Sequence, residues 1–166
     1  MAKKDLLVIE MNNKEDMECF NFREKLKIAQ KPYDYFKEIE NLNFDQLASS
    51  DRIFLQDFGI YNNELNDEEF MLRLRFPAGR ISNNSLILIS NLAQKYNLQI
   101  ILTARAGIQL HGLDSNNILE VFNQINSQNI SSYQSFGDNI RNITSDIFDG
   151  IGVYNIIEVF PYIEQM

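Results

Sequence analysis

The sequence predicts an α+β protein in which helices cover one face of a sheet. From Phe70 onward, segments with the two-residue period of strands alternate with segments of helical period, in the order β-α-β-α. The 166 residues are 45% apolar and 11% aromatic, which is enough to build a core and argues against a disordered chain. A helical arm with a more acidic composition precedes this part, so we expect two regions of unlike character.

The first third of the chain is predicted to be a partly helical arm. The segment 31–39, KPYDYFKEI, has a proline suited to a first helical turn. The segment 43–59 has apolar residues at helical spacing and stops at a glycine. The polar, acidic run 62–69, NNELNDEE, is predicted to be a loop. We place the end of the arm within this loop, at residue 66.

The stretch 70–80, FMLRLRFPAGR, is predicted to form the first strand and a turn. A strand over residues 70–76 sends alternate side chains to opposite faces. The core-facing set would be apolar: Leu72, Leu74 and Phe76. The opposite face would carry Arg73 and Arg75, and the strand would end at the Pro-Ala-Gly sequence.

A helix and a second strand follow. Ser82 or Asn83 is a suitable N-cap for a helix that ends near Asn97. The segment 98–113, LQIILTARAGIQLHGL, begins with a continuous apolar run typical of a central strand. We predict one strand here, with a bulge at Gly107.

The last predicted element is a second helix, capped by Asp114 or Ser115. Both helices have an apolar side that would pack on the same face of the sheet. The opposite face would then gather most of the unusual polar groups: Arg73, Arg75, Gln109 and His111, with Arg105 near them. The pattern therefore places these side chains close together in space.

Composition argues against several classes of function. The formal charge of −8 and the pI near 4.6 argue against general binding to nucleic acid or to anionic membranes. No apolar run approaches the roughly 20 residues of a membrane span, and the N-terminus lacks the apolar run of a signal peptide. We therefore expect a cytoplasmic protein. The single cysteine, Cys19, permits no intrachain disulfide or cysteine metal site and is predicted to be an inert thiol.

Positive charge is nevertheless concentrated in one stretch. Residues 1–69 contain nine basic and sixteen acidic residues, whereas residues 70–113 contain five basic residues and no acid. Four of these five are arginines, whose planar guanidinium groups bind carboxylates and oxyanions through paired hydrogen bonds. The sequence predicts an anion site here. The alternatives are a solvated strand face and, for His111, an ordinary hydrogen-bonding residue.

Several segments, taken in order, resemble the sirohaem-dependent sulfite and nitrite reductases. They are GIY (59–61), FMLRLRFPAGRI (70–81), LTARAGIQLHGL (102–113) and GDNIRNIT (137–144). The segment 22–39 also resembles the N-terminal segment of that family. Each motif is weak by itself, and the segment around residues 136–144 could equally be a simple turn. Their succession at similar spacing is specific.

The resemblance implies a domain order. Residues 1–66 would be the N-terminal arm, residues 67–135 a ferredoxin-like half-domain with an antiparallel sheet, and residues 136–166 the truncated start of the sirohaem-binding catalytic domain. A missing C-terminal half would complete the molecule. The complete oxidoreductase would reduce sulfite to sulfide or nitrite to ammonia, using sirohaem, a 4Fe-4S cluster and an electron donor such as a ferredoxin or a flavoprotein.

The resemblance also implies roles for particular side chains. Arg75 is similar to the arginine directed at the substrate oxyanion, and Arg141 to the arginine that contacts both cofactor and anion, so these two are expected to be catalytic. The remaining matching positions would bind the cofactor: Arg73, Arg105, Gln109, His111, Asn139 and Asn142. Fixed cations would neutralise the cofactor carboxylates and the charge that develops on oxygen as S–O or N–O bonds break.

The sequence departs from the family pattern in three respects. Ala106 stands where the family usually has glutamine, and Pro-Ala-Gly replaces the common Pro-Gly-Gly. The substrate-binding lysines and the cluster-ligating cysteines of the family have no counterparts here, so no metal ligand is expected and the chain alone is expected to be inactive. Two alternatives stay open. One is a non-catalytic sirohaem- or anion-binding module, and the other is a pairing subunit without a ligand.

Overall fold

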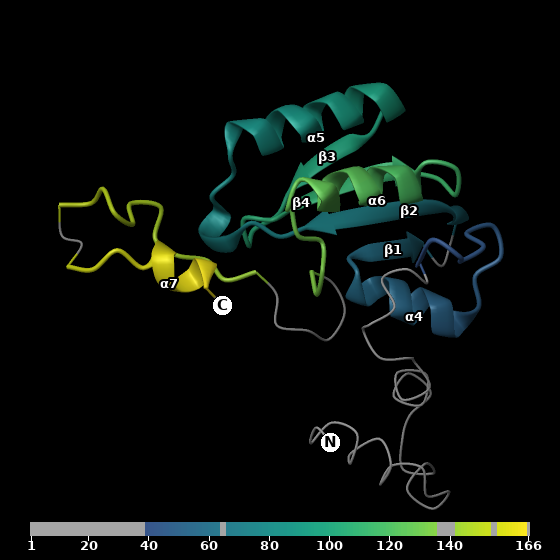
Figure 1. Ribbon diagram of the computed structural model, residues 1–166, viewed down its shortest axis with the longest axis horizontal. Coiled ribbons are helices and arrows are strands. Elements are labelled where there is room, and N and C mark those ends of the chain that lie inside the picture. The colour runs from purple at the N-terminus through teal and green to yellow at the C-terminus, as the bar shows by residue number, and fades with distance from the viewer. Residues whose placement is uncertain (1–38, 64–65, 136–141, 154–155, 166) are drawn as a thin grey trace, which may run out of the picture. The chain divides into compact units, whose positions relative to one another are not determined.

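The computed structural model describes residues 39–63, 66–135, 142–153 and 156–165 (Figure 1). The chain divides into two compact units, one ending at Phe54 and the other beginning at Leu55. The described part of the first unit contains most of helix α4 (Ser49–Asp57). The Asp51 carboxylate accepts a hydrogen bond from the Ala48 amide (3.1 Å), which satisfies a free donor at the helix start. The predicted helix over 43–59 is thus confirmed in a shorter form, whereas residues 31–38 lie outside the described residues.

The second unit contains a four-stranded antiparallel sheet in the order β1-β2-β4-β3. The strands are β1 (Ile60–Asn63), β2 (Asn66–Leu74), β3 (Gln99–Leu102) and β4 (Ile108–Leu113). The prediction of a loop over residues 62–69 is wrong, because most of this run forms the β1–β2 hairpin, in which Asn62 pairs with Phe70. Polar side chains are compatible with this edge of the sheet, since the paired backbone supplies the hydrogen bonds.

The segment 98–113 forms two strands, so the prediction of one central strand is wrong. Strands β3 and β4 are joined by a turn over residues 103–107, in which Ala106 has a left-handed backbone (φ 55°). The Thr103 amide donates to the Gly107 carbonyl (2.9 Å), and the Gly107 amide donates to the Thr103 hydroxyl (3.0 Å). Gly107 therefore belongs to the turn, and β3 is an edge strand with exposed apolar side chains.

Helix α5 (Asn83–Tyr96) confirms the predicted first helix and both of its ends. The Ser82 hydroxyl accepts a hydrogen bond from the Ser85 amide (3.1 Å), which is the N-cap geometry that the sequence predicts. At the other end Asn97 adopts a left-handed conformation (φ 53°), which stops the helix.

Helix α6 (Ile118–Ser127) begins later than predicted. The Asp114 carboxylate accepts hydrogen bonds from the amides of Asn116 (2.9 Å) and Asn117 (3.0 Å). These bonds stabilise the turn that precedes the helix, and the side chain of Asp114 does not act as the N-cap. The prediction that Asp114 or Ser115 caps this helix is therefore wrong.

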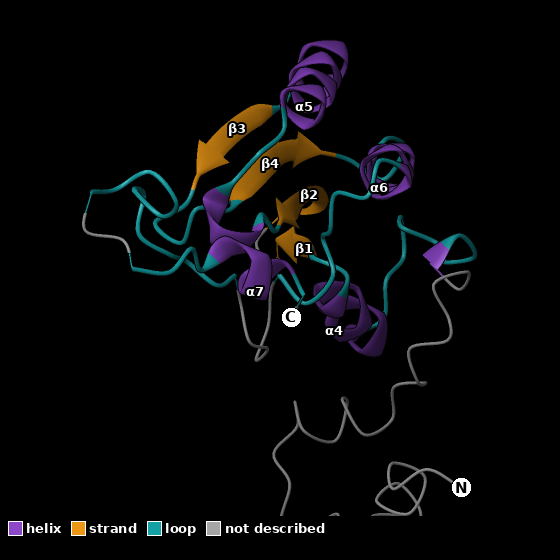
Figure 2. Cartoon of the chain, turned by 60° about the vertical axis from the view of Figure 1, so that its left-hand side comes forward, coloured by secondary structure: helices purple, strands orange, loops and turns teal. Residues whose placement is uncertain are grey.

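The core lies between the sheet and the helices α5 and α6, which Figure 2 shows on one side of the sheet. The largest fully buried side chains come from both layers and include Phe70, Leu72, Leu74, Leu110, Ile89, Ile118, Phe122 and Ile125. The alternation predicted for the first strand is confirmed, because its three predicted core residues are all buried. On the outer surface Lys95 of α5 pairs with Glu120 of α6 (2.8 Å). The hydrogen bond from Lys95 lowers the pKa of the exposed Glu120 carboxyl below its usual range.

A short C-terminal helix is attached to the turn that follows β2. The Pro-Ala-Gly sequence forms the predicted turn as the 3₁₀ segment η3 (Pro77–Gly79), which contacts helix α7 (Phe160–Glu164). The buried Asp149 carboxylate accepts hydrogen bonds from the amides of Val159 (2.8 Å) and Phe160 (2.9 Å), at the start of α7. The Arg80 guanidinium donates to the Asp149 carbonyl (2.9 Å) and stacks over the Phe160 ring (4.1 Å). None of the described helices is long and apolar enough to cross a membrane.

Candidate functional site

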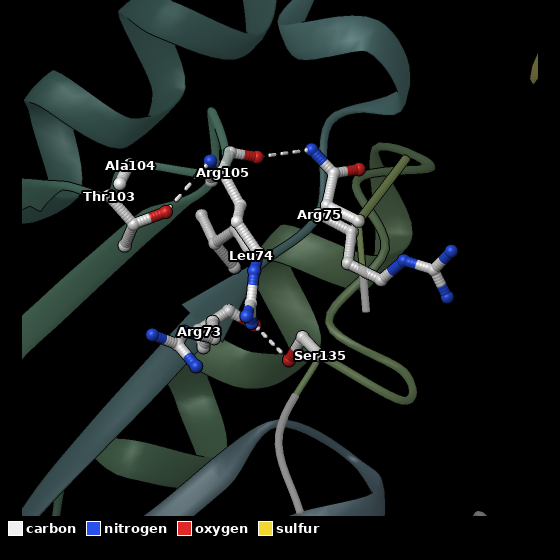
Figure 3. A pocket seen from close by; sticks show the side chains of 9 residues that line it. Arg73, Leu74, Arg75, Thr103, Ala104, Arg105 and Ser135 are labelled. Atoms are coloured by element: carbon white, nitrogen blue, oxygen red, sulfur yellow. Dashed lines mark hydrogen bonds between the residues drawn. The ribbon is translucent and has the colours of Figure 1, made fainter. Parts of the chain in front are cut away.

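A cavity of about 240 Å³ lies where the end of β2 meets the turn between β3 and β4 (Figure 3). Its lining consists of Arg73, Leu74, Arg75, Thr103, Ala104, Arg105, Gly107, Ser135 and Asn142. Two of the arginines come from β2 and the residue after it, and the third comes from the turn. Segments that are about thirty residues apart in sequence therefore bring three arginines to the lining of one cavity.

The strand register determines which predicted residues share a face. Arg73 of β2 lies directly opposite Gln109 of β4, and His111 lies two residues further along the same strand. The His111 Nε2 atom is 3.0 Å from the Gln109 Oε1 atom, so these two side chains form a hydrogen bond on this face. The shared face predicted for Arg73, Gln109 and His111 is confirmed, although Gln109 and His111 do not line the cavity itself.

Arg75 follows the last residue of β2 and is held by its backbone. Its amide donates to the Ser131 carbonyl (2.7 Å) in an isolated β-bridge, and its guanidinium lies 3.5 Å from the Tyr133 carbonyl. The first contact fixes the main chain, and the second is a long and weak hydrogen bond. With respect to the described residues, most of the hydrogen-bonding capacity of the guanidinium is therefore available to a ligand.

Arg105 reaches the cavity from the turn over residues 103–107, as Figure 3 shows. Among the described residues its side chain makes no ion pair, whereas Arg80 and Lys95 both have carboxylate partners. The Ala106 residue beside it is in close contact with η3, because a Cβ atom at Gly79 would lie 2.6 Å from the Ala106 Cβ atom. The turn over residues 103–107, which carries Arg105, therefore lies against η3, the turn that follows β2.

Asn142 is the other predicted site residue that the structure places at the cavity. Its side-chain amide donates to the Phe76 carbonyl (2.7 Å) and to the Arg105 carbonyl (2.8 Å). Its Oδ1 atom is buried and has no hydrogen-bond partner among the described residues. Asn139 and Arg141 lie outside the described residues, so their predicted roles stay predictions.

The charge of the cavity is suited to a ligand with several negative charges. Within the described lining there are three arginines and no aspartate or glutamate. A bound anion would offset the positive charge of these side chains, and its oxygens would accept guanidinium N–H groups. The described lining has two hydroxyl groups, those of Thr103 and Ser135, and no histidine, lysine or carboxylate beside them that could act as a base. The arrangement is suited to binding an anion.

Ser135 and Thr103 line the cavity and were not among the predicted site residues. The buried Ser135 hydroxyl is 2.7 Å from the Arg73 carbonyl and 2.6 Å from the Ser132 carbonyl, so it supports the strand that carries Arg73. A Cβ atom at Gly59 would lie only 2.5 Å from this hydroxyl. Nothing in the local sequence distinguishes Ser135 from its serine neighbours, because its contact with Arg73 is 62 residues distant in sequence.

Most of the cavity lining lies within a segment that matches a known domain. Residues 63–128 match the family model described as the nitrite/sulfite reductase ferredoxin-like half domain. The chain is 28% identical over 155 residues to a ferredoxin–nitrite reductase from Synechococcus elongatus, in a match that covers 90% of this chain. It is 32% identical over 97 residues to the hemoprotein beta-component of an NADPH sulfite reductase from Paenibacillus sp., in a match that covers 54% of this chain.

A solved structure supports the same fold. The chain superposes on the Mycobacterium tuberculosis NirA protein with a TM-score of 0.76 and 21% sequence identity, over 90% of this chain and 32% of that chain. The matches to the two relatives above cover 30% and 17% of those proteins. The chain thus spans less than a third of the length of the relatives that it matches. Among the described residues there is no group of three or more His, Cys, Asp or Glu that could hold a metal ion.

Proposed function

We propose that this chain is part of a nitrite/sulfite reductase, and that its arginine cavity binds the carboxylates of a sirohaem and the small oxyanion that the complete enzyme reduces. One observation carries this proposal: Arg73, Arg75 and Arg105 line a single cavity whose described lining contains no aspartate or glutamate. In a chain of formal charge −8, such a local excess of positive charge is unusual. It supports a polyanionic ligand over a solvated strand face.

The residues present fit one edge of such a cofactor. A sirohaem has many peripheral carboxylates, and guanidinium groups bind carboxylates bidentately. A cavity of about 240 Å³ is too small for a whole tetrapyrrole, so it would receive carboxylate side arms while the macrocycle lies outside it. When bound, the sirohaem and its iron–sulfur cluster would supply the electrons for reduction of the oxyanion.

Different side chains of this protein would bind the substrate oxyanion and the cofactor carboxylates. Arg75, whose guanidinium makes one weak contact within the described part of the chain, is the candidate for the substrate oxyanion. Arg73 and Arg105 would hold cofactor carboxylates, and the hydrogen-bonded pair Gln109–His111 would extend that contact along the open face of the sheet. The predicted roles of Arg141 as a second oxyanion contact and Asn139 as a cofactor contact complete the proposal. Sulfite and nitrite are both candidate substrates, since the same cations bind either anion.

We also propose that the rest of a reductase covers the apolar surface near the C-terminus. Large aliphatic side chains are exposed there: Ile147 (84%), Ile151 (79%), Val153 (94%) and Ile156 (97%). Exposed clusters of this kind are costly in water and mark interfaces. The relatives contain more than twice as much additional chain as the part matched here, which is enough to cover this surface. The complete assembly would then receive electrons from a ferredoxin or a flavoprotein.

The uncovered surface predicts self-association of the 166-residue chain. We expect concentration-dependent oligomers in sedimentation velocity and strong binding of a hydrophobic dye. The double variant Ile151→Asn/Ile156→Asn should reduce oligomer formation and dye binding. Ile87→Asn, on the exposed side of α5, should leave oligomer formation and dye binding unchanged. A monomeric wild-type chain that binds no dye would contradict an interface at this surface.

Titration with sirohaem tests the cavity itself. We expect the visible absorption spectrum of sirohaem to change saturably as the 166-residue chain is added. Arg73→Ala/Arg105→Ala should weaken binding at least about 100-fold, because each lost charge-assisted contact contributes roughly 1.5–3 kcal/mol. Lys95→Ala/Arg52→Ala is the matched control, because it also removes two positive charges but both lie outside the cavity lining.

The two variants separate specific binding from general attraction. Equal weakening by both would mean that the anion is attracted by net charge alone, which would contradict a site at the cavity. Saturable binding that only the cavity variant abolishes would support a preformed cofactor wall. No spectral change with the wild-type chain would contradict cofactor binding by this chain alone, and the same titration with the complete enzyme would then be required.

A further inference from the structure

We propose that Asn142 is a positioning residue that holds Arg105 at a fixed spacing from Arg75, rather than a group that contacts the cofactor. The geometric part of this inference stands on hydrogen bonds within the chain. Its consequence for ligand affinity rests on the proposed function of the arginine cavity. The two parts are therefore tested by separate measurements.

The side chain of Asn142 connects the two segments that carry these arginines. Its Nδ2 atom donates to the carbonyl of Phe76, the residue directly after Arg75, at 2.7 Å. The same atom donates to the carbonyl of Arg105 itself at 2.8 Å. The bonded carbonyls belong to residues 29 positions apart in sequence, so one amide group bridges the main chain just after Arg75 and the main chain at Arg105.

The chemistry of the amide group leaves little capacity for a direct contact with an anion. A side-chain amide has two N–H donors, and both are used by carbonyl groups of the protein. The remaining atom, Oδ1, is an acceptor, and it would repel a carboxylate or an oxyanion. The orientation of the amide is unambiguous, since both of its partners are carbonyl oxygens and accept only from N–H groups. An anion in the cavity would therefore bind the arginines and not Asn142.

The turn that carries Arg105 needs such an attachment. It joins the edge strand β3 to β4, and its Ala106 residue adopts a left-handed conformation that is unfavourable for alanine. Internal hydrogen bonds close the turn, and the pairing of Ile108 with Leu74 ties its β4 end to β2, but none of these contacts bonds the Arg105 carbonyl to the chain that follows Arg75. The neighbouring Ala78 amide donates to the Ile143 carbonyl (2.9 Å), so the segment around Asn142 is itself held beside η3. Through its side chain, Asn142 connects this segment to the turn over residues 103–107.

Amide hydrogen exchange tests the positioning without any ligand. In Asn142→Ala and Asn142→Asp we expect faster exchange at the amides of Thr103, Ala106 and Gly107, whose hydrogen bonds depend on an intact turn. Asn126→Ala is the matched control, because Asn126 also bridges two protein oxygens, the Phe122 carbonyl and the Ser132 hydroxyl, away from the turn. It should leave the turn amides unchanged. Unchanged exchange of the turn amides in both Asn142 variants would overturn the proposal.

A double-mutant cycle tests whether Asn142 acts through Arg105. With sirohaem as the probe, Asn142→Ala should weaken binding about 10-fold in the wild-type chain and less than about 2-fold in the Arg105→Ala background. A loss of about 10-fold in both backgrounds would show direct contact and overturn the positioning role. If the wild-type chain binds no sirohaem, the proposed function of this chain fails, but the hydrogen-exchange result still decides whether Asn142 holds the turn.

Discussion

Replacing Arg75 with alanine in a complete reductase is expected to lower kcat about 100-fold or more, while the free energy of unfolding changes by less than about 1 kcal/mol. The guanidinium is expected to contribute little to stability because its contact among the residues that the structure describes, to the Tyr133 carbonyl, is long at 3.5 Å. The main-chain hydrogen bond to Ser131 does not depend on the side chain and remains in the variant. A cation that stabilises developing negative charge on the substrate contributes mainly in the transition state.

Arg80→Ala is the matched control for this prediction, since it removes the same charge a few residues away. Arg80 pairs with the buried Asp149 carboxylate (3.5 Å) and stacks on Phe160, but it does not line the cavity. Its loss should cost about 1–2 kcal/mol of stability and leave kcat within a few-fold of the wild type. Steady-state kinetics and thermal unfolding of both variants give the comparison. If Arg75→Ala lost stability and turnover in the same proportion as Arg80→Ala, an anion-binding role for Arg75 would be wrong.

The sequence predicted those parts of the fold that depend on local signals. Helix α5 was predicted with both ends because Ser82 and Asn97 are cap residues whose hydrogen bonds and backbone conformation are local. The hairpin of β3 and β4 was missed because its turn contains no Asn-Gly or Asp-Gly pair, and its left-handed position is filled by Ala106. The edge position of β3 was also missed, since an apolar run predicts burial and these residues are exposed.

In the candidate site, too, features that depend on local periodicity were predicted, whereas contacts between distant parts of the sequence were not. The two-residue period correctly predicted that Arg73 shares a sheet face with Gln109 and His111, because the pairing register preserves that alternation. The contacts of Asn142 and Ser135 could not be predicted, because their partners are 37 to 66 residues away in sequence. Such contacts depend on how the strand ends and turns meet in three dimensions, for which a single sequence has no periodic signal.

Gly59→Ala is expected to lower the free energy of unfolding by about 3 kcal/mol or more, a fall of roughly 10 °C in Tm. Gly59 precedes β1 with a left-handed backbone (φ 79°). An alanine Cβ atom there would lie 2.3 Å from the Ser132 carbonyl oxygen and 2.7 Å from the Arg73 carbonyl oxygen. Because these neighbours are backbone atoms, they can move only if the strand end moves. The Gly59 carbonyl also accepts the Arg73 amide (2.9 Å), so the shift would reach the cavity.

Gly112→Ala separates the steric effect from the cost of the backbone conformation. Gly112 also has a left-handed backbone (φ 88°), but a Cβ atom there would meet only the Asn97 carbonyl oxygen, at an ordinary contact distance of 3.8 Å. This variant should cost only about 1–2 kcal/mol, the penalty for a left-handed alanine. Chemical denaturation of both variants measures the difference directly. Equal costs would mean that the space around Gly59 adapts easily, in which case Ser135 and the Arg73 strand end do not form the rigid wall on which the anion site depends.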